Sequence, residues 1–278
     1  MLQREPSADL VRVLKQLKLG KLLPVLPERL RQARERDMDP EDLLLVVLSD
    51  EVQRRMRLRV ANRARKAGLD AEQVFDAWDT TAKVTYDRHL LDELQTLRFV
   101  DEHHHVLVMG PVGVGKTMLA HALGHLAIRR DLSVSCETAD KLFLRLKASR
   151  LDDTHAAELR RLVAVDLLII DDFALRPLDA METADLYELV TARHRRGSMI
   201  LTSNREPAEW LPMLADPLHA QALVDRFTNN AYDLIVEGES YRKRQKPRLS
   251  NDGRPSAARS ASRIASDDSV RRGAGHGT

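Results

Sequence analysis

Residues 106–117 read VLVMGPVGVGKT, a short apolar run followed by the spacing Gly-x-x-x-x-Gly-Lys-Thr. The apolar run predicts a buried strand, and residues 118–130 predict a helix directly after the loop. Glycine lets the backbone adopt conformations that are closed to other residues, and it brings main-chain N–H groups close to an anion. The stretch therefore predicts a strand, a phosphate-binding loop and a helix, and with them an α/β fold.

The residues expected to contact the nucleotide are those of the loop and its ends, namely Gly110, Pro111, Val112, Gly113, Val114, Gly115, Lys116, Thr117 and Met118. Lys116 is expected to neutralise the β- and γ-phosphates, and the Thr117 hydroxyl to ligate Mg²⁺. The positive N-terminal end of the helix faces the same anion. The alternative is a glycine-rich turn that matches by chance, and the flanking strand and helix patterns count against it.

A second, almost continuous apolar run at residues 165–170 ends in Asp171 and Asp172. Such a run is typical of a parallel strand that is buried on both faces. Because ligands bind at the carboxyl ends of these strands, we expect Asp171 in the metal shell and Asp172 polarising the attacking water. The alternative for this pair is a helix cap after the strand.

Polar residues also end the apolar run 199–201, which is followed by Thr202, Ser203 and Asn204. We expect this strand to lie beside the acid-tipped one and its polar end to orient the hydrolytic water. An ordinary turn opener is the alternative for Asn204. Further strands are expected at 133–137 and 233–236, and further helices at 138–150, 179–196 and 218–228.

The clearest helix signal before the loop lies at residues 40–67, with Asp39 as N-cap, Pro40 at the first position and Gly68 as the stop. An apolar stripe along this helix predicts a face that can dock on an apolar surface: Leu45, Leu48, Val52, Met56, Val60 and Ala64. Its second half carries cations without an acidic residue among them: Arg54, Arg55, Arg57, Arg59, Arg63, Arg65 and Lys66. Uncompensated cations repel one another, so we expect these to bind duplex DNA through its phosphates. The alternative is a basic face that only aids solubility or pairs with another subunit.

The length and composition are those of a globular protein with one large and one small part: 278 residues, 43% hydrophobic and 31% charged. The formal net charge of +2 is nearly neutral, so attraction to nucleic acid must come from local clusters. No signal peptide or membrane-spanning run is evident, so a cytoplasmic protein without a membrane partner is expected. Cys136 is expected to be buried rather than reactive, and residues 103–105, three histidines, to lie in a solvated loop.

At this point several segments together resemble one family. Residues 110–117, 167–172, 201–210, 224–226 and 238–242 are similar to the IstB helper ATPases of insertion sequences, AAA+ proteins of the DnaC helicase-loader branch. The resemblance implies a P-loop NTPase core, a three-layer α/β/α parallel sheet, behind a small helical DNA-binding domain. The expected domains are residues 1–70, 71–244 and a disordered basic tail at 245–278, which adds DNA affinity or only solubility.

The resemblance also implies a function and residue roles. ATP would promote assembly of a homo-oligomer on target DNA, which recruits and stimulates a transposase. By position, Lys116 and Thr117 match the Walker A pair, Asp171 and Asp172 the Walker B pair, and Asn204 the sensor. In addition, Arg226 matches an arginine finger that acts in trans, and Arg242 the second sensor. Most AAA+ ATPases have Glu where this chain has Asp172, so we expect slow hydrolysis that DNA or a partner stimulates.

Other functions share these residues. A DnaC-like loader would deliver a replicative helicase instead of a transposase. A DNA-binding protein could use ATP as an assembly switch with little turnover. A small-molecule phosphotransferase would need an acceptor pocket and a mobile cover, and nothing in residues 138–201 suggests one.

Overall fold

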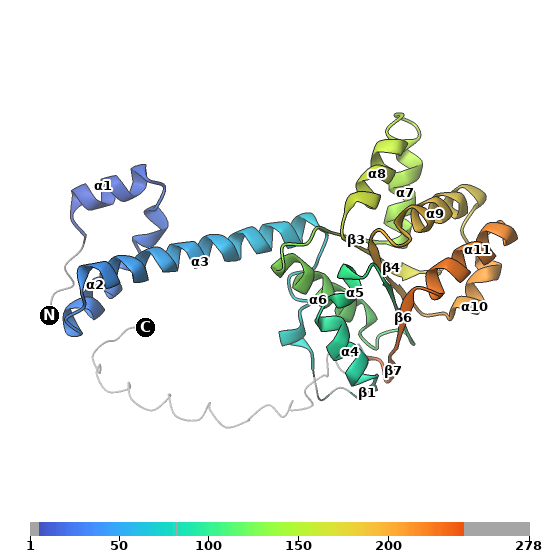
Figure 1. The fold of residues 1–278 in the computed structure, drawn as a ribbon, viewed down its shortest axis with the longest axis horizontal. Coiled ribbons are helices and arrows are strands. Elements are labelled where there is room, and N and C mark those ends of the chain that lie inside the picture. Colours follow the sequence, from blue (N-terminus) through green and yellow to red (C-terminus); the bar gives the residue numbers. More distant parts are fainter. Residues whose placement is uncertain (1–5, 80, 82, 242–278) are drawn as a thin grey trace, which may run out of the picture. The chain divides into compact units, whose positions relative to one another are not determined.

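The computed structural model describes residues 6–79, 81 and 83–241. Its centre is a sheet of five parallel strands in the order β3-β4-β5-β2-β6 (Figure 1). The strands are β2 (His105–Met109), β3 (Val134–Thr138), β4 (Leu167–Phe173), β5 (Ser198–Ser203) and β6 (Ala231–Ile235). All five predicted strands are confirmed. The predicted tail at 245–278 and the second-sensor position Arg242 lie outside the described residues.

Helices cover both faces of the sheet. Successive residues of a strand point to opposite faces, so alternate residues of β2 pack in two separate cores. Val106 and Val108 belong to one core, and Leu107 and Met109 to the other. The first core is covered by α4 (Arg88–Gln95), α5 (Arg98–Asp101) and α6 (Lys116–Arg129). The second is covered by α7 (Ala139–Ser149), α8 (His155–Ala164), α9 (Ala180–Arg193), α10 (Pro207–Trp210) and α11 (Pro217–Thr228). The predicted three-layer α/β/α fold is confirmed.

The strand order sets the position of the site. β5 pairs with β2 on one side and with β4 on the other. The polar end of β5 is therefore next to the acid-tipped strand β4, as predicted. β5 also separates β4 from β2, the strand that leads into the phosphate-binding loop. A two-stranded ladder, β1 (Val84–Thr85) with β7 (Glu237–Gly238), joins the segment before α4 to the end of the described chain.

The predicted long helix is confirmed as α3 (Pro40–Lys66), which follows α1 (Ala8–Gln16) and α2 (Leu26–Glu35). Asp39 caps it by accepting a hydrogen bond from the Glu41 N–H at 2.8 Å. Gly68 ends it at φ +83, where a Cβ would lie 2.2 Å from the Cys136 carbonyl oxygen. The N-terminal part of α3 joins a small core with Leu22 and Leu26 through Val47, whereas Ala64 near its C-terminal end belongs to the first core of the sheet.

Most of the predicted apolar face of α3 is exposed in the described chain. Four residues of the stripe have 46% to 63% of their surface exposed: Leu45, Leu48, Val52 and Met56. Only Val60 and Ala64, the last two, pack against the core of the sheet. The helix carries a second stripe, and the small N-terminal core is built on that one, through Leu43 and Val47.

The histidine prediction is also wrong for His105. This residue begins β2 and is fully buried, with its ring stacked on Phe227 at a centroid distance of 4.9 Å. Burial lowers the pKa of His105 to about 3, so the ring is neutral. The prediction for Cys136 is confirmed: the thiol is buried and unpaired. Within the described residues, no helix is both long and apolar enough to cross a membrane.

Candidate functional site

The phosphate-binding loop connects β2 to α6 as predicted. Two of its glycines have left-handed backbones, Gly113 at φ +85 and Gly115 at φ +104. A Cβ at Gly113 would lie 2.2 Å from the Ser240 Oγ, and one at Gly115 would lie 2.8 Å from the Trp78 indole. Both the dihedral angles and the packing therefore require glycine at these positions.

The ammonium group of Lys116 joins the loop to the end of β5. It donates to the carbonyl oxygens of Gly110 and Pro111, both at 2.8 Å, and to the Asn204 Oδ1 at 2.6 Å. Lys116 is buried although it is charged. The two residues predicted to act on phosphate and water thus lie in direct contact, although 88 positions separate them in the sequence.

A second contact joins the loop to β4. The Thr117 hydroxyl donates to the Asp171 Oδ1 at 3.0 Å, and the buried Thr202 hydroxyl donates to the same oxygen. The described residues contain no group of three or more His, Cys, Asp or Glu side chains suited to a metal. Mg²⁺ is commonly held by one or two side chains together with substrate phosphates, and Thr117 and Asp171 fit that arrangement.

Asp172 lies at an irregularity of β4. The pairing with β5 runs from Ile170↔Leu201 directly to Phe173↔Ser203, so two residues of β4 oppose the single residue Thr202. This arrangement is a β-bulge, and Asp172 within it has a left-handed backbone at φ +56. The helix-cap alternative does not describe Asp171 and Asp172, because residues 171–173 remain in the strand. Asn204 follows the end of β5 in a bend, so the turn-opener alternative describes its backbone.

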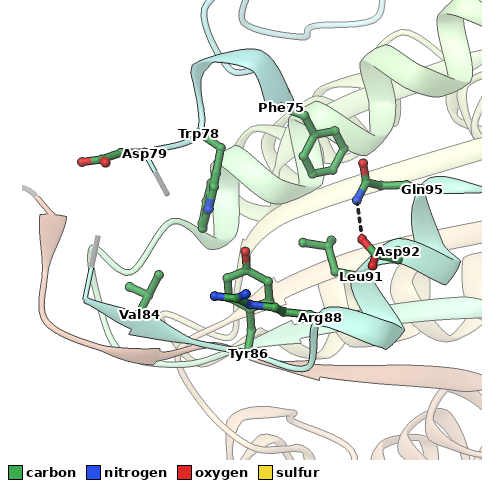
Figure 2. A pocket seen from close by; sticks show the side chains of 9 residues that line it. All are labelled: Phe75, Trp78, Asp79, Val84, Tyr86, Arg88, Leu91, Asp92 and Gln95. Carbon is green, nitrogen blue, oxygen red and sulfur yellow. Dashed lines mark hydrogen bonds between the residues drawn. The ribbon is translucent and has the colours of Figure 1, made fainter. Parts of the chain in front are cut away.

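A cavity of about 410 Å³ has Trp78 in its wall (Figure 2). Figure 2 shows that its walls come from the segment before β1, from β1 and from α4: Phe75, Trp78, Asp79, Val84, Tyr86, Arg88, Leu91, Asp92 and Gln95. The rings of Trp78 and Tyr86 meet edge to face at 5.9 Å. The volume is in the range of small-molecule sites, and the Trp78 indole also contacts Gly115. The sequence did not indicate this cavity.

The end of the described chain also reaches the loop. The Tyr241 N–H donates to the Gly113 carbonyl oxygen at 2.8 Å, and Ser240 packs on the same glycine. Arg242, the residue assigned to the second sensor, follows next in the sequence but is not among the described residues.

Arg226, assigned to the arginine finger, lies on α11 and is held by α9. Its guanidinium donates to the Tyr187 hydroxyl at 3.0 Å and to the Thr191 hydroxyl at 2.7 Å, and it lies 5.2 Å from the centre of the Tyr187 ring. Among the described residues, none of its hydrogen bonds joins it to Lys116 or Asp171.

The premise that the cations of α3 are uncompensated is wrong for four of them. Arg54 and Arg55 both bind Glu51, which precedes the basic stretch by one turn. Hydrogen bonds from Arg54 lower the pKa of Glu51 to about 2. Arg63 and, at 3.8 Å, Arg59 pair with a carboxylate of the loop after α6, Asp131. Arg57, Arg65 and Lys66 are exposed and form no ion pair with a described acidic residue.

Comparisons with known proteins agree with this geometry. Residues 12–249 match the family described as IstB-like ATP binding protein. An ATP-binding protein in an insertion sequence of Mycobacterium tuberculosis is 36% identical over 235 residues, which cover 84% of this chain and 94% of that protein. The ATP-binding protein of insertion sequence IS21 from Pseudomonas aeruginosa is 30% identical over 84% of this chain and 88% of its own length.

Solved structures show a similar fold. The DnaC helicase loader superposes with a TM-score of 0.50 at 19% identity, covering 60% of this chain and 97% of the loader. A replication initiator, DnaA, bound to AMPPCP and single-stranded DNA superposes with a TM-score of 0.50 at 22% identity, covering 62% of this chain and 51% of the initiator. At these identities the likenesses concern the fold alone. By its sequence and its phosphate-binding loop, the chain belongs to the family of IstB-like ATP-binding proteins.

Proposed function

We propose that this protein hydrolyses ATP with Mg²⁺ and uses the nucleotide to control its assembly on duplex DNA as a helper of transposition. The observation that carries the proposal is the contact of Lys116 with Asn204 and of Thr117 with Asp171. These contacts join the phosphate-binding loop, the end of β4 and the end of β5 at one edge of the sheet. In the proposal these segments bind phosphate, hold the metal and orient the water. The names of the relatives, ATP-binding proteins of insertion sequences, support the setting.

In this proposal Lys116 binds the β- and γ-phosphates, and the amides of residues 110–118 surround them. Thr117 and Asp171 hold Mg²⁺, which supplies positive charge against the phosphate oxygens. The 3.0 Å separation of their oxygens places both groups next to the same space.

Asp172 and Asn204 act on the water. Asp172 accepts its proton as general base, and Asn204 orients it by a hydrogen bond. Because aspartate is one methylene shorter than glutamate, its carboxylate has a shorter reach. We expect a slow basal rate that rises when DNA or a partner closes the site.

The base of ATP lies in the cavity of Figure 2, where the Trp78 ring provides an apolar face beside the phosphate-binding loop. The contact of Trp78 with Gly115 supports this placement, because the base and the phosphates of one nucleotide must be adjacent. Arg242 follows Tyr241, which is hydrogen-bonded to the loop, and this supports a contact from Arg242 to the phosphates.

Assembly requires contacts beyond one subunit. Arg226 serves a neighbouring subunit's nucleotide in trans, and its ties to Tyr187 and Thr191 hold it at the side of α11 for that purpose. The cations of α3 contact DNA phosphates, with Arg57, Arg65 and Lys66 the most available. The helical segment 1–70 would then bind DNA, and the ATPase segment 71–244 would hydrolyse ATP. The tail would add basic charge.

Phosphate release with and without duplex DNA tests the enzymatic part, with Lys116→Ala as the blank. We expect release above the blank that DNA increases. A rate equal to the blank in both conditions, with ATP still bound, would instead indicate an assembly switch without turnover.

Sizing with ATP and DNA together tests the assembly. We expect a large species in the wild type and in Arg226→Ala, but hydrolysis only in the wild type. For the partner, the ATP- and DNA-bound protein should retain a transposase of the insertion-sequence type. Retention of a replicative helicase in its place would contradict the transposition setting.

A further inference from the structure

The bulge in β4 changes which face of the sheet Asp172 occupies. Leu168 and Ile170 enter the second core, and a regular strand would send residue 172 to that same apolar face. In this chain Phe173 enters the second core in place of residue 172. The extra residue of the bulge thus keeps the Asp172 carboxylate out of the apolar core, while Asp171 stays on the face of Thr117.

One side chain fastens this arrangement. Thr202 is the residue of β5 that opposes the two aspartates, and it is fully buried. Its hydroxyl accepts from the Asp172 N–H at 2.9 Å and donates to the Asp171 Oδ1. A bulge disrupts the regular ladder, and here a side-chain hydroxyl accepts from the backbone N–H of the bulged residue.

We infer that Thr202 is a positioning residue for both aspartates: it orients the metal-binding carboxylate through one hydrogen bond and fixes the bulged backbone of the general base through the other. The inference rests on the proposed function, because it assigns a part to Thr202 in the same site. A hydroxyl is required in this position, since it must donate and accept at once. Valine has the same shape and can do neither.

The test compares Thr202→Val with Thr202→Ser, which keeps the hydroxyl. The matched control is Thr183→Val, because Thr183 is also fully buried and accepts a backbone hydrogen bond, from Ala215 instead of from an aspartate. Two quantities are measured: ATP affinity over a range of Mg²⁺ concentrations, and the Mg²⁺ dependence of phosphate release.

We expect Thr202→Val to raise the Mg²⁺ concentration for half-maximal effect by about 10- to 100-fold, the usual loss when a partner of a metal ligand is removed. ATP affinity in EDTA should stay within about twofold, because the phosphate-binding loop is unchanged, and kcat should fall at saturating Mg²⁺. Thr202→Ser should restore both values, and Thr183→Val should resemble the wild type. If Thr202→Val does not fold, Thr202→Ala in its place tests the same hydroxyl.

Unchanged Mg²⁺ dependence in Thr202→Val or Thr202→Ala, or an equal loss in Thr202→Ser, would overturn the inference. Its failure differs from that of the proposed function. If the wild type releases no phosphate above the Lys116→Ala blank, hydrolysis is refuted, and the Mg²⁺ dependence of ATP affinity still tests Thr202.

Discussion

Trp78 offers the sharpest test of how the nucleotide is placed. Its indole lies near Gly115, lines the 410 Å³ cavity and meets Tyr86 edge to face. Replacing Trp78 by alanine removes an aromatic face that a purine can stack on. Stacking of one base on an aromatic ring contributes about 1–3 kcal/mol, which corresponds to a roughly 5- to 150-fold weaker affinity.

Calorimetric titration with ATP and with inorganic tripolyphosphate separates the two halves of the ligand. We expect Trp78→Ala to weaken ATP binding by that factor and to leave tripolyphosphate binding within about twofold, because the loop and Lys116 still bind phosphate. Trp78→Phe keeps a ring and should lose no more than about 1 kcal/mol.

The chain has one other tryptophan, Trp210, which is fully buried. A Trp210→Phe protein therefore reports on Trp78 alone, and its fluorescence should change with ATP but not with tripolyphosphate. Equal losses of ATP and tripolyphosphate in Trp78→Ala, or no loss of either, would refute the placement of the base in this cavity.

Three further predictions concern charge and burial. Replacing Arg57, Arg65 and Lys66 together by alanine should weaken duplex DNA binding and leave ATP affinity unchanged. The slope of log affinity against log salt should flatten by about 0.9 per lost phosphate contact. An unchanged slope in a salt titration would remove these residues from the interface. Between pH 6 and pH 4, His105 binds a proton only in the unfolded chain, because its folded pKa is about 3. Its protonation should therefore lower the free energy of unfolding by about 1.4 kcal/mol for each unit that the pH falls. Urea titrations at each pH should show this slope in the wild type and not in His105→Phe. Burial raises the pKa of Cys136 to about 12, so at pH 8 a thiol reagent should label it at the rate of unfolding rather than of chemistry; immediate labelling of the native protein would contradict its position beneath α6.

The phosphate-binding loop and the order of strands and helices could be predicted because their signals are local. Glycine spacing, apolar runs and caps such as Asp39 act within a few residues of where they stand. The position of Asn204 beside the acid-tipped strand followed from one rule, that the carboxyl ends of parallel strands share an edge, whereas its contact with Lys116 was not predicted.

The parts that could not be predicted depend on residues far apart in the sequence. Arg63 pairs with Asp131, 68 residues away, so the lack of acids within the basic stretch was a poor guide to its charge balance. Glu51, one turn before the stretch, was a local signal for the pairing of Arg54 and Arg55. His105 pairs with Ala231 of β6, and its ring stacks on Phe227 of α11; no local pattern encodes either contact. The bulge at Asp172 changes the pairing of β4 with β5 without changing the apolar run that precedes it.

The length of α3 has a mechanical consequence. Its 27 residues rise by about 1.5 Å each, so the helix is a strut of about 40 Å without a proline or glycine after its first position. One end is anchored in the small core of Leu22, and the other packs on α6, whose first residue is Lys116. Because a helix without a proline or glycine in its interior resists local bending, we expect a rotation at one anchor to be transmitted to α6, which begins at Lys116.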